Sequence, residues 1–173
     1  MARKKVVLEE YERTKSHVHK HPKPVSAVLA TTIATLAELG LLTQGSLGYL
    51  VELTAPKIFA IMEKEGYVRR GMDHKELVKK AMEFLGFDEG SYEMEDNGNE
   101  LKLRVITEKC VLDPKSVGGV ELKGTLCPLP FMLASFLMIN DNKDWEVVAE
   151  RKGAHVYVVR KEDGKCEMTL KVA

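Results

Sequence analysis

The sequence predicts an α+β fold, in which N-terminal helices pack on a mainly antiparallel sheet around one buried central helix. Three observations lead to this prediction. Helical patterns fill residues 25–85 before any strand pattern appears, and alternating apolar and polar runs begin at residue 92. An uncharged apolar segment, residues 129–139, precedes the last strands. Helices followed mainly by consecutive strands are typical of layered α+β domains and not of alternating βαβ folds.

The segment Leu129–Ile139 is the predicted central helix. Its apolar side chains would point in every direction around the helix axis, and such a helix must be covered on all sides. Because about 20 residues are needed to cross a bilayer, the segment is too short to span one. Pro130 suits a first helical turn, where the backbone N–H groups have no intrahelical partner. Residues 140–142 are expected to end the helix.

Three further helices are predicted before the first strand. The first covers residues 25–39, where apolar side chains recur three and four positions apart. The second begins near Ser46 and keeps its 3.6-residue period through Pro56, where we expect a kink. The third begins after Asp73, which is placed as an N-cap, and ends before Gly86.

The strands are predicted from residue alternation and from turn residues. Residues 92–95 and 101–105 alternate apolar with polar side chains, and Asn97-Gly98 lies between them. An Asn-Gly pair between two alternating runs is a strong indication of a β-hairpin. Three more short strands are predicted after the central helix, at residues 145–150, 154–160 and 166–172.

The composition limits the kinds of partner. The chain has 173 residues, and its 26 Lys plus Arg balance its 26 Asp plus Glu. Zero net charge argues against nucleic acid and anionic membranes, because both favour a basic protein face. With no recognisable secretory signal and no segment of transmembrane length, we expect a cytoplasmic protein with reduced cysteines and no membrane insertion. We divide the chain into an N-terminal extension, residues 1–24, and a single domain, residues 25–173.

No catalytic signature is recognisable, so we predict no catalytic residues. The sequence has no glycine-rich dinucleotide loop, no Walker loop, no Gly-x-Ser-x-Gly and no His-Glu-x-x-His. His17, His19 and His21 alternate in a segment expected to be extended, where they would share one side and could bind a metal. A solvated connector is the simpler interpretation, because no carboxylate or cysteine lies nearby in the sequence.

Cys110, Cys127 and Cys166 are the candidate metal ligands. Cys127 is expected at a helix start, where the helix dipole lowers a thiol's pKa and favours the thiolate that binds zinc. Structural zinc usually has four ligands with two in a close Cys-x-x-Cys pair, whereas these cysteines are far apart in the sequence. The alternative is that all three are half-buried and act as small apolar residues.

The C-terminal run Gly164-Lys165-Cys166-Glu167-Met168 resembles the ending of the 4-vinyl reductase domain family. Cys110 and Cys127 resemble cysteines of this family, and the resemblance covers residues 25–173. It implies a fold similar to the ligand-binding domains of haem nitric-oxide sensors and TRAPP tethering subunits. It also implies a hydrophobic ligand between helices and sheet, a homodimer and, as in some members, zinc. Val158 stands where the family often has a further cysteine, and neither haem nor nucleotide is expected.

We therefore predict a non-catalytic protein that binds or senses a small hydrophobic molecule of the hydrocarbon, aromatic or acyl-chain type. The pocket is expected beside Pro56, because a kinked helix cannot pack continuously against a straight one. Its predicted lining is Leu47, Val51, Ile58, Met62, Phe131, Met132 and Phe136. Two alternatives are an enzyme or enzyme subunit acting on a tetrapyrrole-like or other hydrophobic substrate, and a dimeric scaffold without a ligand that associates through its alanine-rich first helix.

Overall fold

The computed structural model describes residues 24–113, 126–153 and 155–173. The predicted histidine segment, residues 17–21, lies outside these ranges. The helices are α2 (Pro24–Glu38), α3 (Gln44–Lys64), α4 (His74–Phe84), the short 3-10 helix η1 (Thr107–Lys109) and α5 (Leu129–Asp141). The strands are β1 (Tyr92–Asp96), β2 (Glu100–Ile106), β3 (Trp145–Val147), β4 (Glu150–Lys152), β5 (His155–Tyr157), β6 (Arg160–Glu162) and β7 (Lys165–Val172).

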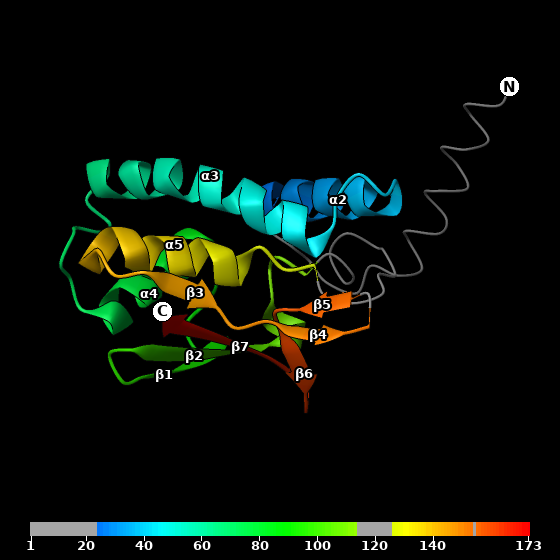
Figure 1. The fold of residues 1–173 in the computed structure, drawn as a ribbon. Helices are drawn as coiled ribbons and strands as arrows, with labels where there is room; N and C mark the ends of the chain where they lie inside the picture. The colour runs from blue at the N-terminus through cyan, green and yellow to red at the C-terminus, as the bar shows by residue number, and fades with distance from the viewer. Residues whose placement is uncertain (1–23, 114–125, 154) are drawn as a thin grey trace, which may run out of the picture.

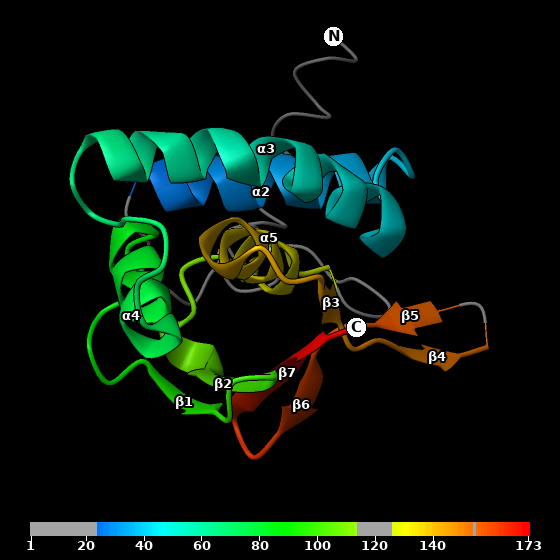
Figure 2. The same ribbon diagram turned by 60° about the vertical axis from the view of Figure 1, so that its left-hand side comes forward.

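The elements form three layers, which Figures 1 and 2 show from two directions. Helices α2 and α3 lie on one side of α5, the main sheet lies on the other side, and α4 closes one end. The main sheet has the order β1-β2-β7-β3, β6 also pairs with β7, and β4 and β5 form a separate pair. All of these pairs are antiparallel. The predicted α+β class, with N-terminal helices and one central helix, is confirmed.

Helix α5 is buried along nearly its whole length, as its uncharged sequence predicts. Its central residues Leu133 and Leu137 are fully buried, and Phe136 meets Phe59 of α3 edge to face with ring centroids 5.7 Å apart. The helix ends at Asn142, which adopts a left-handed conformation with φ of 59° and donates its backbone N–H to the Met138 carbonyl. None of the helices in the described part of the chain is long and apolar enough to cross a membrane.

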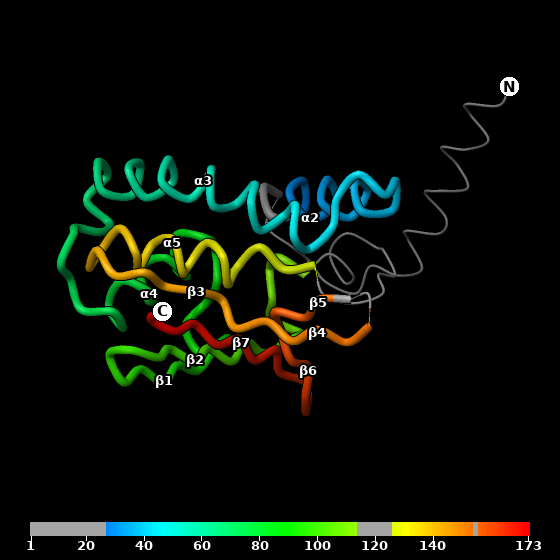
Figure 3. The backbone as a smooth tube through the Cα atoms, in the orientation of Figure 1, coloured from blue at the N-terminus to red at the C-terminus, as the bar shows by residue number. Residues whose placement is uncertain are grey.

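Helix α3 continues through Pro56 as one element, and Figure 3 shows its axis changing direction along its length. It begins slightly earlier than predicted, because Thr43 is the N-cap and forms a reciprocal capping box with Ser46. Near its start it approaches α5 closely. A Cβ atom on Gly48 would lie 2.7 Å from the Phe131 ring, so this contact depends on the absence of a side chain.

The C-terminal region contains five short strands where three were predicted. Predicted strand 145–150 is divided between β3 and β4, and predicted strand 154–160 contributes to β5 and β6. The reason is that the chain leaves the main sheet after β3, forms the β4–β5 pair and then returns at β6. Asp163 and Gly164 both have positive φ between the paired residues of β6 and β7, as a two-residue type I′ turn requires.

Candidate functional site

A groove of about 540 Å³ lies between α3, α5 and β3. This volume falls within the ~300–1,000 Å³ range of small-molecule sites in proteins. The groove opens to solvent. Its lining residues are Glu52, Pro56, Phe131, Ala134, Ser135, Met138, Ile139, Asp144, Trp145, Glu146 and Val147.

The apolar walls of the groove come from α5 and β3. Phe131, Met138 and Ile139 occupy the part of α5 that neighbouring elements leave least covered, and the Met138 side chain is 40% exposed. Trp145 begins β3, is buried, and donates its indole N–H to both carboxylate oxygens of Asp141 at 3.1 and 3.2 Å. This bond fixes the indole behind the flexible Met138, and only a small part of the buried ring faces the groove.

The α3 side of the groove lies at the proline. Pro56 has no backbone N–H, so the carbonyl of Glu52, four residues earlier, loses its intrahelical donor. Both residues line the groove. The other polar positions in the lining are Ser135 and the carboxylates of Asp144 and Glu146, and none of the described lining residues is basic. The groove therefore combines apolar walls with an acidic edge.

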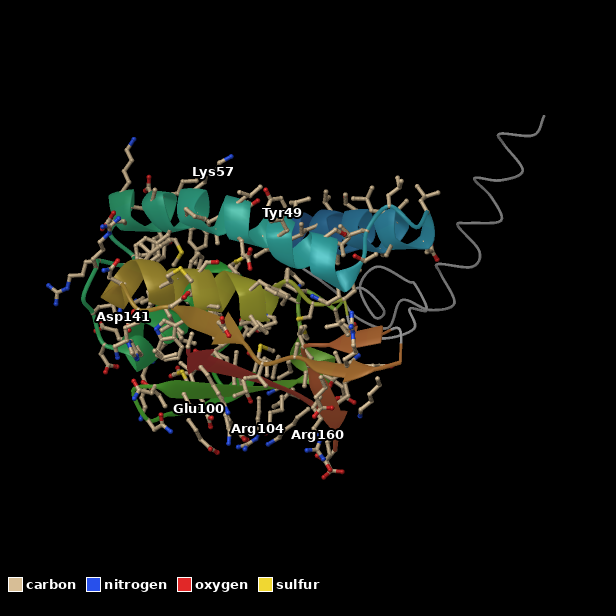
Figure 4. The ribbon with its side chains drawn as sticks, viewed as in Figure 1. Tyr49, Lys57, Glu100, Arg104, Asp141 and Arg160 are labelled. Carbon is tan, nitrogen blue, oxygen red and sulfur yellow. The ribbon has the colours of Figure 1, made fainter. Side chains whose placement is uncertain are left out.

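A second hollow, of about 460 Å³, lies over β6 and β7. Its walls mix Lys152, Arg160 and Lys161 with Glu150 and Glu167. Figure 4 labels Arg160 at the far end of the molecule from Asp141, and several of these side chains are strongly exposed. Val158, Val159 and Met168 give the second hollow apolar walls as well, but its ionic side chains are of both signs, whereas the charged residues of the groove are carboxylates alone.

The structure brings only one of the seven predicted lining residues to the groove, namely Phe131. Ile58 is half-buried against the core. The other five form part of the core between α3 and α5: Leu47, Val51, Met62, Met132 and Phe136. The inward face of α3 therefore packs tightly against α5, and the opening lies to the side of α3, at Pro56. Ligand binding by the predicted set stays a prediction.

The predicted cysteine ligands are Cys110 after η1, Cys127 just before α5, and Cys166 in β7. Burial raises the pKa of the Cys127 thiol far above its usual range, and proximity to Cys110 and Cys166 raises it further. The three thiols therefore lie in one region. No three His, Cys, Asp or Glu side chains among the described residues are arranged to hold a metal. Zinc binding stays a prediction.

The backbone at Cys127 is fixed by a buried amide. Gln44, in the first turn of α3, accepts from the Cys127 N–H at 2.9 Å and donates to the Cys127 carbonyl at 3.2 Å. These two bonds join the start of α3 to the start of α5 and satisfy the Gln44 amide without exposing it to water.

A polar cluster that the sequence did not predict lies around His74. Its Nε2 lies 3.2 Å from an Asp141 carboxylate oxygen and its Nδ1 lies 3.5 Å from Asp96, while Trp145 packs edge-on against the ring. Both ring nitrogens face carboxylates, so neither is directed at a substrate, and the cluster is structural. These residues are scattered along the sequence, and no local pattern could have identified their contact.

Comparisons with known proteins correct one prediction. Residues 40–172 match the model of the MJ0207 family. The chain is also 28% identical over 108 residues to "Uncharacterized protein MJ1342" of Methanocaldococcus jannaschii, an alignment that covers 62% of this chain and 88% of the relative. No solved structure matches.

The predicted membership of the 4-vinyl reductase domain family is wrong, because the family match is to a different family. The motif behind that prediction has a local explanation. Gly164 belongs to the tight β6–β7 turn, and Cys166 is paired with Val105 inside the sheet, an ending that many antiparallel sheets could share. With a family match that extends over most of its length, the chain belongs to the MJ0207 family.

Proposed function

We propose that the protein is a non-catalytic binding protein for a small molecule with an apolar body, held in the groove between α3, α5 and β3. The observation that supports this most directly is a groove of about 540 Å³ with Trp145, Phe131 and Met138 in its walls. Apolar surface removed from water contributes roughly 25 cal/mol per Å² before the costs of association, so such walls favour a guest held mainly by burial.

The groove residues favour binding over catalysis. Ser135 is a possible nucleophile in the lining, but its hydroxyl donates to the Phe131 carbonyl at 2.9 Å. No histidine or lysine is among the described lining residues, and the Ser135 hydroxyl donates to a backbone carbonyl and not to one of the lining carboxylates, so it is not set up as an activated nucleophile. The alternative of an enzyme acting on a hydrophobic substrate would need an activated group of this kind.

The proposal includes a homodimer. The described residues of a single chain form the groove between α3, α5 and β3. Ligand binding and association of two copies are separate parts of the proposal, and different variants test them.

Ligand binding is testable through the single tryptophan, Trp145, which lies in the groove wall. A panel of aromatic, hydrocarbon and acyl compounds should contain some that change its fluorescence and raise the melting temperature, because a ligand that binds only the folded state stabilises it. Met138→Arg, at a position already 40% exposed, should abolish both effects by placing a long charged side chain across the apolar wall.

The matched control is Phe84→Arg, the same kind of substitution at a side chain that is 37% exposed on α4 and outside the groove lining. This variant should keep the ligand response. If no compound changes the fluorescence or the melting temperature, or if Met138→Arg responds like the parent, the groove is not the binding site.

A further inference from the structure

Among the described residues, none covers an apolar surface that helices α2 and α3 present on the side away from α5. We define the outer helical face by Val28, Leu39, Leu41, Tyr49, Leu50 and Leu53, each between 54% and 69% exposed. We propose that this face binds the same face of a second copy of the chain around a two-fold axis. The inference gives the homodimer of the proposed function its interface, and it does not depend on the groove.

The outer helical face is apolar even at its threonines. Thr32 donates its hydroxyl to the Val28 carbonyl at 2.8 Å, and Thr35 donates to the Thr31 carbonyl at 2.9 Å. Both threonines are exposed, but their hydroxyl protons are already used inside the helix. These positions therefore need no polar partner, and a second helix could cover them without leaving a donor unsatisfied.

The outer helical face lies opposite the buried sides of α2 and α3. The buried residues of α2 include Ala30 and Ala34, and those of α3 include Val51 and Ala55, so these sides are already covered. Ala30 and Ala34 therefore cannot contact a second copy, as association through the alanines of the first helix would require. Exposed side chains on the opposite sides, with Lys57 projecting from α3 away from α5, mark the free surface (Figure 4).

Charge favours a second copy of the chain over a nucleic acid or an anionic membrane as the occupant. Residues 24–56 contain no Lys, Arg or His and only two carboxylates, Glu38 and Glu52, although 30% of the whole chain is charged. Nucleic acids and anionic membranes bind through basic side chains, and this segment offers none. A two-fold interface brings each patch against itself, so a charged patch would repel its copy and an uncharged one does not.

The composition of the face also suits a dimer. Stable homodimer interfaces are more apolar at their centre than ordinary protein surface, and charged residues are depleted there. The outer helical face has this composition, with Lys57 and Glu52 at its edges.

The test measures the mass of the full chain in solution by light scattering during gel filtration, over a range of concentrations. We expect a dimer for the parent and a monomer, or an at least 100-fold weaker dimer, for Leu53→Glu, which buries like charges at the interface. Leu53→Lys should behave in the same way, and a mixture of the two variants should associate again because their charges are opposite. Val148→Glu, at a 40% exposed site outside the face, is the control and should remain dimeric.

Circular dichroism and the intrinsic fluorescence of Trp145 verify that each variant is folded. A monomeric parent would overturn the inference, and so would a dimer that Leu53→Glu and Leu50→Glu leave intact. A protein that dimerises but binds no ligand would contradict the proposed ligand binding in the groove and would not contradict the proposed dimer interface. The two proposals therefore fail separately.

Discussion

At the scale of single residues, the groove depends on a glycine that the sequence places inside a helix. Gly48 allows the Phe131 ring to lie against the backbone of α3, where a Cβ atom would meet two ring carbons at 2.7 and 2.8 Å. Such separations are too short for real contacts, so a side chain at this position must displace the ring. Since Phe131 is half-buried and lines the groove, the space open to the ring is the groove itself.

Gly48→Ala should therefore impair ligand binding more than stability. Alanine gains about 0.5–1 kcal/mol of helix propensity, which offsets part of the ~1–3 kcal/mol typical of overpacking. We expect the free energy of unfolding in urea to fall by less than about 2 kcal/mol while the Trp145 response to ligand is lost. Gly45→Ala is the matched control, because its Cβ would meet only the Thr43 hydroxyl at 3.9 Å. Unchanged ligand affinity in Gly48→Ala would show that the ring does not move into the groove.

At the scale of elements, local sequence predicted most helices and the β1–β2 hairpin. Helix α5 could be predicted because a dozen uncharged residues must be covered on all sides, and α4 because Asp73 accepts from the backbone N–H groups of Lys75 and Glu76. The division of the C-terminal strands into five could not be predicted. Whether a segment pairs with β7 or leaves the main sheet depends on residues that are distant in the sequence. Most residues that line the groove were not named from the sequence, because periodicity does not tell which side of a helix its neighbours cover, and ligand binding by the predicted set stays a prediction.

The central position of α5 predicts a large loss of stability when one of its core side chains is shortened. Phe136 is 1% exposed and packs against Phe59, so Phe136→Ala should lose about 3–5 kcal/mol of unfolding free energy by leaving a cavity. Phe84→Ala removes the same ring from a site that is 37% exposed and should cost clearly less. Urea unfolding of both variants measures the difference. Equal losses would mean that α5 is not the centre of the core.

At the scale of the whole molecule, a few polar contacts hold the layers together at the two ends of α5. At its start, Gln44 joins α3 to Cys127. At its end, the Asn140 amide donates to the Met72 carbonyl at 3.0 Å and accepts from the Met72 N–H at 3.1 Å. Beside it, Asp141 connects α5 to α4 through His74 and to β3 through Trp145. Apolar packing alone would let α5 slide or turn, whereas these directional bonds fix its position.

Asp141→Ala should therefore loosen several elements at once. The buried Trp145 N–H would lose its acceptor and His74 would lose one of its carboxylates, so we expect a loss of about 1–3 kcal/mol of unfolding free energy. Asp141→Asn keeps an oxygen for the indole and should lose less, and Asp144→Ala, at an exposed position, should change little. Hydrogen exchange locates the effect: faster exchange is expected in β3 and in the β1–β2 hairpin, which His74 reaches through Asp96. If exchange in Asp141→Ala rises only at the end of α5, the cluster stabilises that helix end alone and does not couple the layers.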